Sequence, residues 1–197
     1  MPAKSSNTRE KILSTASELF YRKGIRNVGV DEVIAASGVA KMTLYKHFPS
    51  KDQLILETVQ YRDELWCRWF FGTVEQRGSS AKERLIGMFD VLEEWFVSPE
   101  FRGCPFINAV AELADSGHPA HRAALGPRHA IRTYVQKLAE EAGLPNSEEF
   151  SQQFVILFGG AIVMASMEGG PAAAQYARQA ASVLLSAEQT GDLAKGV

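Results

Sequence analysis

Two short segments with helical periodicity, separated by a glycine, constrain the fold of this chain more than any other feature. They cover residues 30–37 and 41–47, and Gly38 lies between them. Glycine permits a tight turn because it adopts left-handed backbone angles without strain, and Pro49 prevents the second helix from continuing. Helices of this length are unstable in isolation, so each must pack against its neighbours. The apolar side chains that suit this packing are Val30, Val33, Ile34, Val39 and Leu44.

Helical periodicity also runs through the rest of the chain, and we find no run of strand alternation. Asn7 and Glu10 form a capping pattern for a first helix that ends at Gly24, and Ser50 with Gln53 forms one for a long helix. Segments rich in proline and glycine separate the later helices. These helices are expected at residues 80–97, 105–116, 119–142, 147–168 and 172–188.

Length and composition are typical of a globular protein with a sizeable core. The chain has 197 residues, of which 46% are hydrophobic and 22% charged. We therefore predict an all-α protein with a three-helix domain at residues 1–50 and a larger helical domain at residues 51–197.

The N-terminus is polar, unlike a secretory signal, and the uncharged run at 150–167 has fewer than the roughly 20 apolar residues that span a bilayer. We predict a cytoplasmic protein and interpret this run as a helix buried on nearly all sides.

The charge is unevenly distributed along the chain. Residues 1–51 carry nine Lys or Arg against four acids, a net charge of +5, whereas residues 52–197 carry twelve against nineteen, a net charge of −7. Such asymmetry indicates a nucleic-acid-binding segment on an acidic body.

No acidic residue occurs in the stretch 41–51, whose basic and hydroxyl side chains suit phosphate contacts: Lys41, Thr43, Tyr45, Lys46, His47 and Lys51. The pattern predicts a DNA-binding helix-turn-helix at about 31–48; the alternative is a solvated basic hairpin.

The segment at residues 38–55, "GVAKMTLYKHFPSKDQLI", resembles the signature of the TetR (tetracycline-repressor-type) family of transcriptional regulators. Similarity extends over about residues 8–58. The resemblance implies that phosphate groups are contacted by Tyr45, Lys46, His47 and Lys51. It implies that bases or flanking phosphates are contacted by Lys41, Met42 and Thr43. A further phosphate contact, at the start of the first helix, would involve Thr8 and Arg9.

Three residues depart from the family pattern. Ala40 replaces the usual serine cap, and Ile34 replaces a small alanine in the bracing helix. Met42 replaces the common glycine and places an apolar side chain near the base edges. These departures leave the implied phosphate contacts in place but change the expected base preference.

The C-terminal part of the chain contains two candidate interface stripes. Helix-turn-helix proteins usually bind palindromic sites as dimers, and the resemblance implies a homodimer formed through the last two helices. One stripe is apolar and comprises Phe150, Phe154, Phe158, Ile162 and Ala165. The other consists mostly of small residues and comprises Ala173, Ala177, Ala180, Ala181 and Leu184. The alternative is that both stripes close the core of the monomer.

The middle helices are rich in aromatic residues and methionine. A mostly apolar cavity with a few polar groups is typical of small-molecule sites, and the resemblance implies an effector pocket here for a small, largely apolar molecule. Candidate lining residues are Met88, Trp95, Phe106, Asn108, Glu112, Tyr134 and Phe158. Effector binding would lower the affinity for a palindromic double-stranded operator.

Other chemistries receive weaker support. Asp115, His118 and His121 could hold a metal, but their loop-like context favours a helix start. Cys104 beside Arg102 could be redox-sensitive, although an inert buried thiol is the simpler interpretation. We find no nucleophile, metalloprotease or phosphate-loop motif, so we predict neither an enzyme nor a cofactor. The prediction is a homodimeric, ligand-responsive transcriptional repressor; the alternative is a helical small-molecule-binding protein without operator function.

Overall fold

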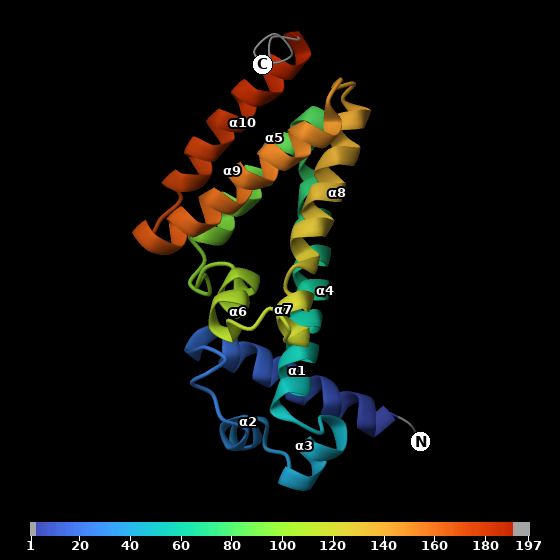
Figure 1. Ribbon diagram of the computed structural model, residues 1–197, viewed down its shortest axis with the longest axis vertical. Helices are drawn as coiled ribbons and strands as arrows, with labels where there is room; N and C mark the ends of the chain where they lie inside the picture. Colours follow the sequence, from blue (N-terminus) through green and yellow to red (C-terminus); the bar gives the residue numbers. More distant parts are fainter. Residues whose placement is uncertain (1–2, 191–197) are drawn as a thin grey trace. The chain divides into compact units, whose positions relative to one another are not determined.

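The computed structural model describes the backbone of residues 3–190 and the side chains of residues 7–188 (Figure 1). Its regular elements are α1 (Ala3–Lys23), α2 (Val30–Ser37), α3 (Lys41–His47), α4 (Lys51–Arg77), α5 (Ala81–Phe96), α6 (Pro105–Leu113), α7 (Pro119–Ala123), α8 (Gly126–Glu141), α9 (Ser147–Glu168) and α10 (Ala172–Thr190). Between residues 3 and 190 there is no strand, and the predicted all-α class is confirmed.

The chain forms two compact units. The first contains the chain up to Trp66 together with Pro105–Gly126, and the second contains Cys67–Cys104 together with the chain from Pro127 onward. The first unit therefore includes α1, α2, α3, the beginning of α4, α6 and α7. It is larger than the predicted domain at residues 1–50. The second unit contains the end of α4 with α5, α8, α9 and α10.

Two predicted helix boundaries are wrong. α1 begins at Ala3, so the capping pattern at Asn7 and Glu10 lies inside the helix. The single helix expected at 119–142 is divided into α7 and α8. Pro127 explains the division, because proline lacks the N–H that would continue the hydrogen-bond ladder, although it is tolerated in the first turn of a new helix.

The predicted turn at Gly38 joins α2 to α3. Gly38 ends α2 in the left-handed region, with φ of +65°, and its N–H donates to the Ile34 carbonyl at 2.9 Å. α3 packs against both α1 and α2. Leu44 of α3 and Phe48, which directly follows the helix, are fully buried, and burial of each stabilises the fold by about 1.5–3 kcal/mol. Ser50 caps α4, since its Oγ accepts the Gln53 N–H at 3.1 Å.

Arg62 connects the beginning of α4 to α1 within the first unit. Its Nε donates to Ser17 Oγ at 3.0 Å, and its Nη2 donates to the Ser17 carbonyl at 3.1 Å. The guanidinium also lies 4.3 Å from the ring centroid of Tyr21. Burial lowers the pKa of Arg62, and these contacts offset the cost of removing its charge from water.

A carboxylate from α6 occupies the turn between α1 and α2. Glu112 Oε2 accepts the backbone N–H of Arg26 at 3.1 Å. Gly24 ends α1 with φ of +88°, and a Cβ at this position would lie 3.0 Å from the same carboxylate oxygen. Both the backbone angle and the carboxylate therefore favour glycine at position 24.

In the second unit, α9 and α10 lie side by side (Figure 1). By length and composition α9 could cross a membrane. Its inner face is buried in this unit through Phe150, Phe154, Phe158, Ile162 and Ala165. The predicted burial of this helix on nearly all sides is nevertheless wrong, because its outer face is exposed, with Ile156 at 69%.

The stripe predicted on α9 for a dimer interface therefore lies in the core, whereas the stripe predicted on α10 lies there only in part. All of the α9 stripe is buried, and so are Ala177 and Ala181 on α10, whereas Ala180 is exposed. The stripes could not be assigned from the sequence because α9 and α10 each have apolar residues on two faces. The phenylalanines of α9 fill the interior, whereas Ile156, Val163 and Met167 remain outside.

We expect Gly24→Ala to lower the free energy of unfolding by about 1–3 kcal/mol, because it adds backbone strain and crowds Glu112. The matched control is Gly38→Ala, which has a similar backbone angle but whose Cβ would meet only Lys11 Nζ, at 3.9 Å. The control should cost about 1 kcal/mol. Urea unfolding measures both. Equal losses would show that the Glu112 carboxylate does not constrain position 24.

Candidate nucleic-acid interface

The exposed face of α3 lies opposite its buried anchor. At about 3.6 residues per turn, successive side chains are about 100° apart, so Met42 and Lys46 point away from Leu44 and Tyr45 lies beside them. Of the predicted contact residues, Lys41, Met42, Tyr45 and Lys46 are exposed, and Thr43, His47 and Lys51 are half-buried. The structure therefore brings the α3 residues together on one surface, with Lys51 at the start of the next helix.

Two acids at the start of α2 pair with lysines of the first unit. Asp31 Oδ1 lies 3.3 Å from Lys41 Nζ, and Glu32 Oε1 lies 2.6 Å from Lys23 Nζ. Carboxylates in a first helical turn interact favourably with the helix dipole. Both ends of the Lys41 pair are exposed, and such pairs contribute little to stability. Lys41 can therefore exchange Asp31 for another anion at low cost.

The sequence predicts Thr8 and Arg9 at the start of the first helix. In the structure they lie in the second turn of α1. The Arg9 guanidinium pairs with the carboxylate of Glu57 on α4 and lies 5.5 Å from the ring centroid of Phe48. Arg9 therefore braces α1 against its neighbours. Thr8 and Arg9 therefore lie beyond the first turn of α1, to which the favourable effect of a helix dipole on an anion is confined.

The predicted effector residues divide between the two units. Phe106, Asn108 and Glu112 belong to α6 in the first unit. Met88, Trp95, Tyr134 and Phe158 belong to the second unit. The Glu112 carboxylate binds the turn after α1, and sequence reasoning missed this contact because its two partners are 86 residues apart.

Aromatic rings join three of the second-unit candidates into one cluster. The ring centroids of Tyr134 and Phe71 are 4.6 Å apart. Phe70 follows, with its centroid 5.8 Å from that of Phe71 and 5.4 Å from that of Phe158. Trp69 continues the cluster, 6.1 Å from Phe70 and 6.4 Å from Trp95. Met88 is fully buried in the same unit.

The Tyr134 hydroxyl is a buried polar group carried by one ring of this cluster. Its oxygen is enclosed and has no hydrogen-bond partner among the residues that the structure describes. Removal from water raises the pKa of Tyr134, and the negative charge of Glu75 adds to the increase. A buried hydroxyl without a partner costs about 1–3 kcal/mol, so such groups are candidates for contact with a bound molecule.

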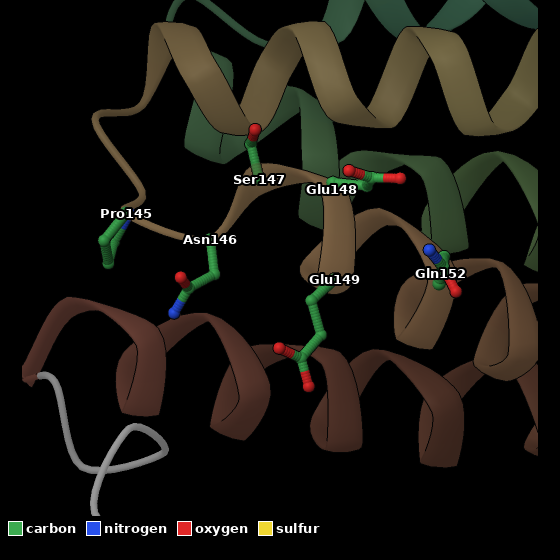
Figure 2. A pocket seen from close by; sticks show the side chains of 6 residues that line it. All are labelled: Pro145, Asn146, Ser147, Glu148, Glu149 and Gln152. Carbon is green, nitrogen blue, oxygen red and sulfur yellow. The ribbon is translucent and has the colours of Figure 1, made fainter.

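Two hollows in the second unit involve α9. A polar one of about 410 Å³ lies at the start of the helix and is lined by Pro145, Asn146, Ser147, Glu148, Glu149 and Gln152 (Figure 2). An apolar one of about 400 Å³ lies between α9 and α10 and is lined by Gln153, Ile156, Leu157, Ala180, Val183, Leu184 and Ala187. Neither lining includes a predicted effector residue.

His118 and the two cysteines bear on the metal and redox chemistry considered from the sequence. His118 caps α7, since its Nδ1 accepts the Ala120 N–H at 3.1 Å, in agreement with the helix-start interpretation. Its Nε2 lies 3.7 Å from Asp52 Oδ1. Among the described side chains, no group of His, Cys, Asp and Glu is placed to hold a metal. Cys67 and Cys104 are half-buried, where the sequence favoured buried thiols.

Comparisons with known proteins agree with a helix-turn-helix unit followed by a C-terminal helical domain. Residues 12–58 match the family described as "Bacterial regulatory proteins, tetR family". Residues 81–181 match "Tetracyclin repressor-like, C-terminal domain". A solved TetR-family transcriptional regulator from Streptomyces coelicolor is 30% identical, with a TM-score of 0.83 over 91% of this chain and 95% of that chain.

Curated relatives are also regulators. The uncharacterized HTH-type transcriptional regulator YxaF of Bacillus subtilis is 23% identical over 93% of both chains. An uncharacterized HTH-type transcriptional regulator of Lactococcus lactis is 27% identical over 55% of this chain, which spans 56% of that relative's length. The helix-turn-helix, the basic exposed face of α3 and these matches lead to one conclusion: the chain belongs to the TetR family of DNA-binding transcriptional regulators.

Proposed function

We propose that this protein is a homodimeric, ligand-responsive repressor that acts in the cytoplasm and binds a palindromic DNA operator. The observation that carries the proposal is the outer face of α3, where Met42 and Lys46 point away from the buried side of the helix and Tyr45 lies beside them, in a stretch without acids. A face of this kind fits the major groove, with hydroxyl and basic groups on phosphates.

Each contact residue has a proposed role. Phosphate contacts are assigned to Tyr45, Lys46, His47 and Lys51, and base or flanking phosphate contacts to Lys41, Met42 and Thr43. Lys41 would release its exposed contact with Asp31 on binding. Thr8 and Arg9 are left out of the proposed set, because α1 begins earlier and Glu57 already neutralises the Arg9 guanidinium.

We expect Lys51→Ala to weaken binding to all DNA sequences alike and to reduce the salt dependence by about one phosphate contact, whereas Thr43→Ala should re-rank sequences. Fluorescence anisotropy at about 50 and 200 mM salt measures both, with DNA from upstream of the protein's own gene and a scrambled duplex. A changed order of preference among DNA sequences without loss of affinity in Lys51→Ala would contradict its phosphate role.

If neither that DNA nor a selection from genomic fragments gives salt-sensitive, selective binding, the alternative of a helical small-molecule-binding protein is favoured.

We propose that dimerisation uses the outer faces of α9 and α10. Their exposed apolar side chains include a set that recurs at helical spacing: Ile156, Val163, Met167, Tyr176, Ala180 and Val183. The apolar hollow between the two helices lies on this surface. Contiguous exposed apolar surface is typical of protein–protein interfaces, and a two-fold contact places the same surface of each copy against the other.

Val183→Glu should raise the dimer dissociation constant about tenfold or more, because it buries an unpaired charge in the interface. Val97→Glu is the matched control, since Val97 is 61% exposed after α5, outside this surface, compared with 71% for Val183. Sedimentation equilibrium measures both variants. Equal dissociation constants for the two would mean that the dimer forms elsewhere.

We propose that the effector binds in the second unit against the aromatic cluster, with its polar group on the Tyr134 hydroxyl. Effector binding would favour a dimer with poorer operator affinity, a coupling of typically about 1–3 kcal/mol.

Tyr134→Phe should leave stability unchanged or raise it by up to about 1 kcal/mol, because it removes a buried hydroxyl without a partner. The same variant should weaken the release of DNA by compounds that displace it from the wild-type protein. Thermal unfolding and anisotropy measure the two effects. A marked loss of stability would show that the hydroxyl has a structural partner, and unchanged release would exclude it from the effector site.

A further inference from the structure

Met42 is the most exposed large apolar side chain among those that the structure describes, at 84%. It is the second residue of α3 and points away from the buried Leu44. Packing therefore does not explain a methionine at this position. A single exposed apolar residue is common on protein surfaces, so the surroundings of Met42 decide what it can do.

The neighbours of Met42 are polar groups suited to phosphates. Lys46 and Tyr45 lie beside it on the same face, and Lys41 is held at one edge by its 3.3 Å contact with Asp31. When this face enters a major groove, the long cationic and hydroxyl side chains reach the backbone on either side. Met42, near the middle of the face, is then directed at the base edges.

The chemistry of the groove restricts what an apolar side chain can contact there. The base edges present hydrogen-bond donors and acceptors, and the C5 methyl group of thymine is the apolar group among them. A thioether is a weak acceptor and donates no hydrogen bond, so it would remove water from the other base edges without compensation. It is also unbranched and flexible, and can therefore reach a methyl group without demanding a single geometry.

We propose that Met42 is a specificity-determining residue that contacts the C5 methyl group of a thymine in each operator half-site. The inference rests on the proposed function, because it requires α3 to read DNA. It adds one feature of the operator, an A·T pair with its thymine facing Met42. Loss of one buried methyl group should weaken binding about fourfold.

Replacement of thymine by deoxyuridine tests the contact, since deoxyuridine lacks only the methyl group. An operator is first selected from random duplexes with the full-length protein, and each thymine of a half-site is then replaced in turn. We expect one position at which the wild-type protein binds about fourfold more weakly. Met42→Ala should show no difference at that position, whereas Met42→Leu should keep it.

Lys46→Ala is the matched control from the same face of α3. It should bind all duplexes more weakly but keep the fourfold difference between thymine and deoxyuridine. Selective binding in which Met42→Ala retains the difference, or in which no thymine shows one, overturns the inference and leaves the proposed function standing. Absence of selective, salt-sensitive binding to any duplex overturns both.

Discussion

Burial of Leu44 and Phe48 is the constraint on which the DNA-reading surface depends. α3 has seven residues, too few for a helix to persist in water. Its existence and its orientation are therefore set by these two side chains, which are fully buried in the first unit. Because one side of α3 is committed to the core, the opposite side, with Met42 and Lys46, remains exposed to solvent.

Polar contacts between distant segments hold the support for α3 in place. Arg62 binds Ser17 and joins α4 to α1, and Arg9 with Glu57 does so further along the same pair of helices. Glu112 adds α6, whose carboxylate accepts the backbone N–H of Arg26. A carboxylate bound to a backbone N–H is a strong, directional contact. α6 is thereby part of the unit that carries the reading surface.

The second unit divides its apolar residues between an interior and a surface. Aromatic side chains of α9 such as Phe154 fill the interior, while Ile156 and Val183 remain exposed. Both sets follow helical spacing, and both are apolar. A helix with two apolar faces can serve a core and a second subunit at once, which is the basis of the proposed dimer.

The sequence by itself determined the helical class, the turn at Gly38, the Ser50 cap and the acid-free face of α3. These features depend on backbone preferences and periodicity within a few residues, and they are therefore readable from local pattern. The tertiary structure alone decided that Arg9 pairs with Glu57, that Glu112 binds the turn after α1, and which face of α9 is exposed. The first two depend on segments far apart in the chain. The third could not be read from periodicity, because both faces of α9 are apolar and only packing selects the inner one.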